Sequence, residues 1–218
     1  MNYEQHGDVA VLHFDDGKAN VVGHDLIAAM HQGLDRAAKD AQAVVILGRP
    51  GRFSAGFDLD ELKKGQQESL ALVTAGAHML LRMFSYPQPL IGACTGHAIA
   101  AGAFMLLSCD TRIGTAGDFK LGLNETAIGM VLPVFGLELA AARLSRRHLT
   151  AATIQARLFN PEEAMDAGFL DEVVAGENLQ QRSIEVATQL AQYPSEAYAG
   201  NKLAIRESSI ERIRQSLE

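Results

Sequence analysis

Short apolar runs of strand length alternate with longer segments of helical periodicity through much of the chain, and this alternation constrains the fold more than any other feature. Residues 9–14 alternate as a strand does, whereas residues 24–39 place apolar side chains at helical spacing. Further segments of the two kinds follow in turn, strand-like at 44–47, 90–94 and 111–114 and helix-like at 66–84 and 101–109. The pattern is typical of an α/β protein.

Beyond Pro133 the pattern becomes mainly helical. The helices expected there span 134–144, 151–158, 161–167 and 179–193, with one short strand at 169–174. Pro161 is followed by two glutamates, which suits a first helical turn because proline loses no bond there and carboxylates complement the helix dipole. We therefore expect an α/β core over residues 1–175 and a C-terminal helical extension over residues 176–218.

Composition excludes several classes of function. The chain has 218 residues, of which 48% are hydrophobic and 21% charged, as in an ordinary compact globular protein. A net charge of -7 provides no basic face for nucleic acid. No stretch reaches the ~20 apolar residues of a membrane span, and the first residues lack a signal-peptide pattern. We expect a cytoplasmic protein with no nucleic-acid or membrane partner, in which Cys94 and Cys109 are buried free thiols.

Three segments rich in small residues stand out, namely 53–59, 96–103 and 122–129. Small side chains allow a ligand to approach the backbone closely, although tight packing would explain each of these segments singly. The third segment places Glu125 between a glycine-bearing turn and an apolar helical stretch. Together the segments suggest an oxyanion hole and a base.

These segments resemble the signatures of the crotonase superfamily, which contains the enoyl-CoA hydratases and isomerases. Residues 53–59 resemble the first signature and 96–110 the second, while Asn124-Glu125 with Gly129 and Pro133 is similar to the third. The resemblance covers about residues 9–174. It implies a superhelix of strand–strand–helix (ββα) turns with a C-terminal helical region, assembled as a homotrimer or a dimer of trimers.

The resemblance also implies a ligand, a coenzyme A thioester, with no further cofactor. It places the adenosine end at the turn Lys18-Ala19-Asn20, and lines the coenzyme with Ala55, Asp58 and Leu59. The oxyanion donors it implies are the backbone N–H groups of Phe57 and Ala101, the second at a helix start. Asp58 has a second interpretation, as the cap of a short helix. No His, Cys or Asp spacing resembles a metal site, so no metal is expected.

The acids in the expected pocket differ from those of the hydratases, which by this resemblance use two glutamates. Phe104 occupies the first position and Glu125 the second. One carboxylate suffices to carry a proton from C2 to C4 of a 3-enoyl thioester. Phe104, expected in the substrate pocket with Pro133, would exclude water and raise the basicity of Glu125. The third segment looks most like that of the monofunctional Δ3,Δ2-enoyl-CoA isomerases.

Other interpretations stay open at this point. Enoyl-CoA hydration, thioester hydrolysis with Glu125 activating water, and a non-catalytic acyl-CoA-binding subunit are the alternatives. A peptidase like the Clp proteases of related fold is disfavoured, because Ala100-Ala101 occupies the place of a nucleophile and Ser54 has no histidine at a diagnostic spacing. Glu125 also has a purely structural interpretation, as a first-turn helix acid capped by Asn124.

Overall fold

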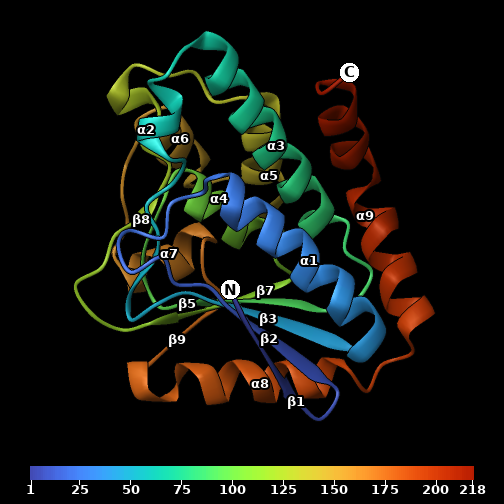
Figure 1. Cartoon of the computed structure of the whole chain (residues 1–218). Coiled ribbons are helices and arrows are strands. Elements are labelled where there is room, and N and C mark those ends of the chain that lie inside the picture. Colours follow the sequence, from blue (N-terminus) through green and yellow to red (C-terminus); the bar gives the residue numbers. More distant parts are fainter.

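Two sheets form the interior of the protein, whose computed structural model describes all residues from 1 to 218 (Figure 1). The larger sheet has the order β1 (Asn2–His6), β2 (Val9–His13), β3 (Ala43–Leu47), β5 (Leu90–Cys94), β7 (Thr111–Thr115) and β9 (Glu172–Val174). The smaller sheet contains β4 (Gly51–Ser54), β6 (Gly96–Ile99) and β8 (Leu121–Gly122). Only the β1–β2 pair is antiparallel.

Successive strands alternate between the two sheets, so that β3 and β4, β5 and β6, and β7 and β8 form three pairs. A helical segment follows each pair. The helices are α1 (His24–Asp40), α2 (Leu59–Leu62), α3 (Gln66–Phe84), α4 (Ala101–Ser108), α5 (Val134–Arg143), α6 (Leu149–Thr153), α7 (Pro161–Ala167), α8 (Leu179–Leu190) and α9 (Ser195–Gln215). The expected α/β architecture of ββα turns with a C-terminal helical region is therefore confirmed.

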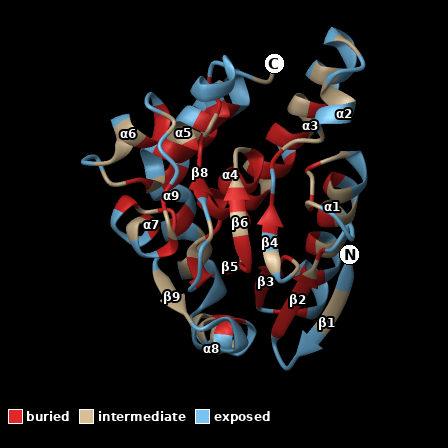
Figure 2. Ribbon diagram, turned by 90° about the vertical axis from the view of Figure 1, so that its left-hand side faces the viewer, coloured by how far each residue is buried: buried red, intermediate tan, exposed pale blue.

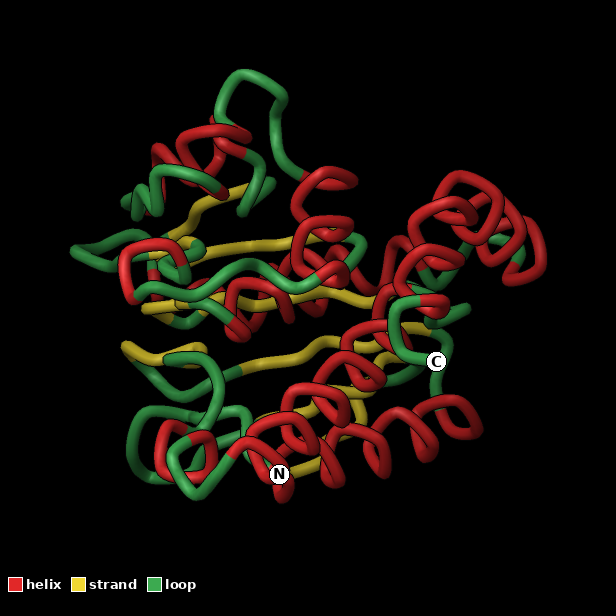
Figure 3. Tube along the Cα trace, turned by 90° about the horizontal axis from the view of Figure 1, so that it is seen from above, coloured by secondary structure: helices red, strands yellow, loops and turns green.

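Helices cover both faces of the larger sheet. Helix α8 crosses one face, where it contacts β2, β3, β5 and β7, and α1 packs on the other face against β2 and β3. Successive residues of β2 accordingly point into different clusters, Val9 and Val11 toward α8 and Ala10 and Leu12 into the main core. Burial on both faces explains why the central strands are continuous apolar runs (Figure 2). Seen from above, helices and loops surround the strands (Figure 3).

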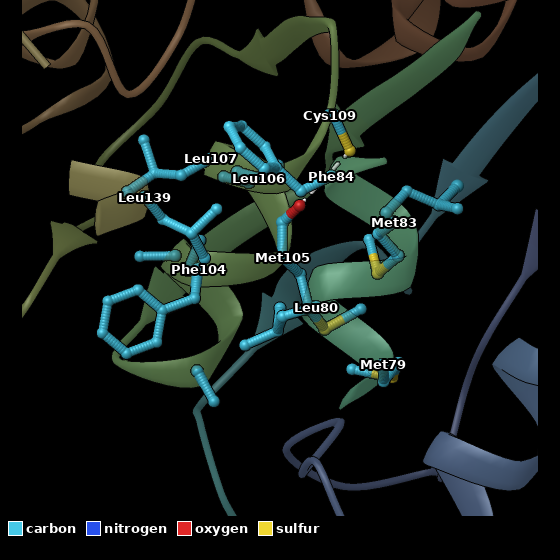
Figure 4. Close-up of a cluster of buried hydrophobic side chains, with 14 of the residues drawn as sticks. Met79, Leu80, Met83, Phe84, Phe104, Met105, Leu106, Leu107, Cys109 and Leu139 are labelled. Atoms are coloured by element: carbon cyan, nitrogen blue, oxygen red, sulfur yellow. Dashed lines mark hydrogen bonds between the residues drawn. The ribbon is translucent and has the colours of Figure 1, made fainter. Parts of the chain in front are cut away.

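Helix α4 lies at the centre of the main core, and all eight of its residues are buried. Its side chains pack against Met79 and Met83 of α3 on one side and Leu139 of α5 on the other (Figure 4). A helix that is apolar on all sides has no solvent face, so α4 is held in place from every direction. Its N-terminus is correspondingly fixed, and it is this end that contributes to the site described below.

Helix α9 packs against α5 and α3 and is anchored through buried charges. Asp110, between α4 and β7, accepts a hydrogen bond of 2.5 Å from Lys202 Nζ and pairs with Arg206 Nη2 at 2.9 Å. Lys202 also donates to the carbonyls of Tyr86 and Gln88. The helix expected over 179–193 is α8, and α9, within the extension expected over 176–218, was not predicted as a separate helix. The boundary proposed at residue 175 stays a prediction.

Several predicted bounds were wrong. The helix expected over 151–158 is α6, which ends at Thr153, and Ala156 beyond it adopts a left-handed φ of 51°. The strand expected from Phe169 begins only at Glu172, because the N–H groups of Phe169 and Leu170 both bond the Ala164 carbonyl at the end of α7. Strands β1, β4, β6 and β8 were not predicted.

Cys94 and Cys109 are buried and free, as predicted. Burial raises the pKa of each thiol to about 12, so both stay protonated and unreactive. Cys109 Sγ contacts the Met105 carbonyl within α4 (Figure 4). No helix combines the length and the apolar character needed to cross a membrane.

Candidate functional site

The backbone at Phe57 presents an N–H group that has no backbone partner. The preceding carbonyl, that of Gly56, accepts a bond of 2.8 Å from the Val22 N–H. The C=O and N–H of a planar trans peptide point in opposite directions, so the Phe57 N–H points away from Val22. Gly56 has a φ of 100°, which favours glycine at this turn.

A second N–H group is presented by Ala101, the first residue of α4. The Ala100 carbonyl accepts the first helical bond, from the Phe104 N–H at 3.0 Å, and the Ala100 N–H donates to the Gly122 carbonyl at 2.9 Å. The Ala101 N–H has no acceptor within the helix and points out of its N-terminus, where the dipole is positive. Ala100 itself has a left-handed φ of 51°, a strained conformation that is concentrated at functional sites.

The two N–H groups are neighbours in space. A Cβ atom placed on Gly56 would lie 3.5 Å from the Ala101 nitrogen and 3.1 Å from the Ala100 Cβ. A Cβ on Gly102 would lie only 2.4 Å from the Ser54 carbonyl oxygen, so the start of α4 sits directly against the end of β4. The fold thus brings the first two signature segments together, with two free donors side by side as an oxyanion hole requires.

Glu125 follows β8 and precedes a short 3-10 helix, η1 (Thr126–Ile128). Its side chain is only 6% exposed and its Oε2 atom has no hydrogen-bond partner. Burial raises the pKa of this carboxyl above its ordinary value. No side chain caps η1, so the interpretation of Glu125 as a helix acid capped by Asn124 is wrong. A buried carboxylate oxygen without a partner marks Glu125 as a candidate functional residue.

Glu125 is tied to the two donors through the smaller sheet. The carbonyl that accepts the Ala100 N–H belongs to Gly122, and Ile99 pairs with Gly122 in the β6–β8 ladder. Glu125 therefore lies three residues after Gly122, whose carbonyl fixes the start of α4. Glu125 and the two N–H groups therefore follow strands that are consecutive in the smaller sheet.

Of the residues predicted for the substrate pocket, Phe104 lies in α4 and packs against α5, and Pro133 precedes α5. The Phe104 ring meets that of Phe135 edge to face with centroids 5.6 Å apart, and a Cβ on Gly136 would lie 2.7 Å from Phe104 Cζ. With 1% of its surface exposed, Phe104 is part of the closed wall between α4 and α5. Pro133 is the residue before α5 and is half-buried.

The residues predicted to hold coenzyme A are only partly free to do so. The Ala55 N–H donates to the Ala19 carbonyl at 3.1 Å, which joins the two predicted segments. The Asn20 side chain is buried and bonds the carbonyls of Phe14 and Arg52, among others. Asp58 caps α2 by accepting the N–H groups of the second and third residues after it. The Asn20 side chain is therefore committed to the fold, whereas Asp58 uses only Oδ1 for the cap.

Of the other four predicted coenzyme residues, Lys18, Ala55 and Leu59 are exposed and Ala19 is half-buried. Lys18 borders a hollow of about 510 Å³ whose lining contains no hydrophobic residue. The other charged or titratable residues of the hollow are Arg49, Arg52 and His97, none of which was predicted to bind coenzyme A. Arg52 lies in β4 and Arg49 just before it, and both meet Lys18 only in the folded chain, where Arg49 Nη1 donates to the Lys18 carbonyl at 2.8 Å. No sequence motif marks this hollow.

His97 contributes a hydrogen-bond donor to the hollow. Its Nδ1 accepts the Lys120 N–H at 3.0 Å, which leaves Nε2 to carry the proton of the neutral ring. Burial, together with the charge of Arg52, lowers the pKa of His97. The hollow is positively charged, because two arginines and one lysine line it and no carboxylate does. Asp15, outside this lining, pairs with Arg49 at 3.6 Å. Such a surface suits a phosphate-bearing ligand.

The sequence model of the enoyl-CoA hydratase/isomerase family matches residues 4–217. The chain is 27% identical over 210 residues to the human mitochondrial enoyl-CoA delta isomerase 1, covering 94% of this chain and 70% of that protein. It is 31% identical over 170 residues to a probable enoyl-CoA hydratase of Bacillus subtilis, covering 74% of this chain and 64% of that one.

Solved structures agree with this similarity. An enoyl-CoA isomerase of Mycobacterium tuberculosis superposes with a TM-score of 0.95 at 37% identity, covering 99% of this chain and 95% of the other. The fold is therefore shared along nearly the whole length of both chains.

Proposed function

Because the chain belongs to the enoyl-CoA hydratase/isomerase family, whose members act on acyl-CoA thioesters, we propose that it moves the double bond of a 3-enoyl-CoA to the 2-position. The observation that carries the proposal is the environment of Glu125, a buried carboxylate with one unpartnered oxygen. The position of a second acid is filled by Phe104, which packs into the wall between α4 and α5. One acid beside two free N–H donors suits a proton shuttle.

In the proposed reaction the thioester oxygen accepts hydrogen bonds from the N–H groups of Phe57 and Ala101. The Glu125 carboxylate removes a proton from C2, and the electron pair of that C–H bond delocalises into a dienolate whose negative oxygen the two donors stabilise. The protonated Glu125 then returns the proton to C4. The double bond now joins C2 and C3, and the carboxylate is regenerated.

Hydration is the alternative that the similarity to the Bacillus hydratase keeps under consideration. It requires a water molecule held and deprotonated beside the double bond. Phe104 opposes this step, because an aromatic ring in the wall excludes water and offers no acceptor for its proton. Isomerisation needs neither water nor a second acid.

Replacement of Glu125 by glutamine tests the proposal. Glu125→Gln keeps the shape of the side chain but cannot accept a proton, so isomerisation of a 3-enoyl-CoA should fall by about 10²- to 10⁴-fold. Acyl-CoA affinity measured by calorimetry should change little. Glu162→Gln, at an exposed position in the first turn of α7, is the matched control and should retain full activity.

Parallel assays separate the alternatives. The parent protein is incubated with a 3-enoyl-CoA, a 2-enoyl-CoA and a saturated acyl-CoA, and conjugated enoyl absorbance and thiol release are followed together. Loss of conjugation from the 2-enoyl-CoA would indicate a hydratase, and thiol release would indicate a thioesterase. An unchanged rate in Glu125→Gln would remove Glu125 from the mechanism.

We also propose that the adenosine end of coenzyme A lies near Lys18, Ala19 and Ala55, with its phosphates in the hollow lined by Arg49 and Arg52. No other cofactor is needed for the proton shuttle. Arg52→Ala should weaken binding of an acyl-CoA about tenfold, as expected for loss of one charge-assisted hydrogen bond. Arg36→Ala, which removes an exposed arginine from α1, should have no such effect.

Acyl-pantetheine, which lacks the nucleotide, distinguishes a phosphate contact from general damage. Arg52→Ala should bind it as the parent does, and equal weakening toward both ligands would place the phosphates elsewhere. The trimer or dimer of trimers expected from the resemblance stays a prediction, and light scattering that finds a monomer at micromolar concentration would exclude it.

A further inference from the structure

Ser54, the last residue of β4, is fully buried and makes an unusual local bond. Its Oγ accepts the Gly56 N–H at 3.2 Å, two residues further along the chain. This bond fixes the peptide group between Ala55 and Gly56. The bond from the Val22 N–H to the Gly56 carbonyl fixes the second peptide group, between Gly56 and Phe57. The Phe57 N–H belongs to that second peptide, so its direction depends on both contacts.

The same serine contacts the element that carries the other donor. A Cβ on Gly102 would lie 2.4 Å from the Ser54 carbonyl oxygen and 2.8 Å from the Ser54 Cβ. The β4–β6 register shifts between Arg52 and Ser54, and this irregularity places Ser54 opposite Ala98 of β6. Ser54 is thus lodged between the turn that presents Phe57 and the first turn of α4, which presents Ala101.

We propose that Ser54 is a positioning residue of the oxyanion hole, whose hydroxyl fixes the separation and direction of the Phe57 and Ala101 N–H groups. The hydroxyl acts as an acceptor for the backbone and not as a nucleophile, since it is buried and bonded to the Gly56 N–H. The inference rests on the proposed function only in assuming that an acyl-CoA carbonyl binds these two N–H groups.

Catalysis depends on the alignment of the donors with the developing oxyanion, whereas ground-state binding depends on it much less. Loss of the Ser54 hydroxyl leaves the Gly56 N–H without its acceptor and lets the turn relax. We expect a decrease of about tenfold in kcat, below the ~10²- to 10³-fold that follows removal of a donor itself. KM should stay within about twofold of the parent value, because the substrate contacts are retained.

The test compares Ser54→Ala with Ser183→Ala. Ser183 in α8 is also fully buried, and its hydroxyl also bonds the backbone, donating to the Leu179 carbonyl at 2.8 Å. Ser183 lies on the face of the larger sheet that is turned away from the main core and from Ser54. Its replacement therefore reports the general cost of removing a buried serine hydroxyl. Both variants should show similar losses of thermal stability, and only Ser54→Ala should lose kcat.

A spectroscopic readout makes the test independent of isomerase activity. A 3-oxoacyl-CoA ionises readily at C2, and its enolate absorbs in the near ultraviolet, so the enolate fraction of the bound ligand reports oxyanion stabilisation. The parent and Ser183→Ala should bind the ligand largely as enolate, and Ser54→Ala should bind it with about a tenfold smaller ratio of enolate to keto form.

The possible outcomes distinguish failure of this inference from failure of the proposed function. An enolate signal in the parent that is weakened in Ser54→Ala supports the inference, even if no 3-enoyl-CoA is isomerised and the proposed function fails. An undiminished enolate signal in Ser54→Ala overturns the inference and leaves the isomerase proposal intact. Absence of the enolate from the bound parent overturns both, since the two N–H groups then form no oxyanion hole.

Discussion

At the scale of single residues, burial gives Glu125 a pH dependence that can be measured. Desolvation raises its pKa above the ordinary value of a glutamate. Only the carboxylate removes a proton from C2, so activity should be lost as the pH falls through this raised pKa. The acid limb of the kcat/KM profile should therefore lie above ~4.3, the value of an unperturbed glutamate. A limb at or below that value would mean that another group titrates.

The same raised pKa lowers stability at neutral pH. Between the ordinary and the raised pKa of Glu125 the folded state binds more protons than the unfolded state, so stability falls as the pH rises through that window. Glu125→Gln should consequently unfold at a higher temperature than the parent at pH 7, and this advantage should vanish below pH ~4. Melting curves at the two pH values test the sign directly.

At the scale of elements, the close approach of α4 to β4 allows only glycine at position 102. A Cβ there would meet the Ser54 carbonyl oxygen at 2.4 Å, and a backbone atom cannot move aside as a flexible side chain does. Gly102→Ala should therefore displace the start of α4, costing about 1–3 kcal/mol of stability and most of the activity. Thermal melts and the isomerase assay measure the two losses.

Gly200→Ala is the matched control, because Gly200 lies inside α9 and a Cβ there would have no atom within 4 Å. It should raise stability by about 0.5–1 kcal/mol through helix propensity and leave activity unchanged. If Gly102→Ala behaved in the same way, the tight contact between α4 and β4 would not be needed for the site.

Elements whose signals are local were predictable from the sequence. The bounds of α3 and α7 match the prediction, and α7 carries a complete capping box between Asn160 and Glu163. Strands β4, β6 and β8 were missed because they have two to four residues each and exist through pairing with distant segments. The residue pattern singled out Glu125 and the family resemblance supplied the backbone donors, whereas Arg49 and Arg52 were missed because the basic hollow exists only in the fold.

At the scale of the whole molecule, the alternation of strands between two sheets assembles the site. The three signature segments are separated by tens of residues, yet they accompany β4, β6 and β8, which are consecutive in the smaller sheet. Pairing of Ser54 with Ala98 and of Ile99 with Gly122 aligns their carboxyl ends. The two N–H groups and Glu125 therefore lie at the same edge of the sheet, because the strands are parallel.

The attachment of α9 gives the last prediction, which concerns the stability of the whole fold. Asp110 holds Lys202 and Arg206 through separate carboxylate oxygens, and the side chains of all three are at most 8% exposed. Asp110→Asn removes the negative charge but leaves two buried cations, a change that typically costs ~3–5 kcal/mol. We expect a markedly lower melting temperature and earlier proteolytic cleavage of α9.

Glu211→Gln serves as the comparison, because it removes an exposed carboxylate that pairs with Arg214 on the same helix at 3.0 Å. Surface pairs of this kind contribute little, since water and salt screen both charges, so its melting temperature should match that of the parent. If Asp110→Asn also melted with the parent, the attachment of α9 would have to come from its apolar contacts, such as Ile210 and Ile213 in the main core. The buried charges would then set only the register of the helix along α5 and α3.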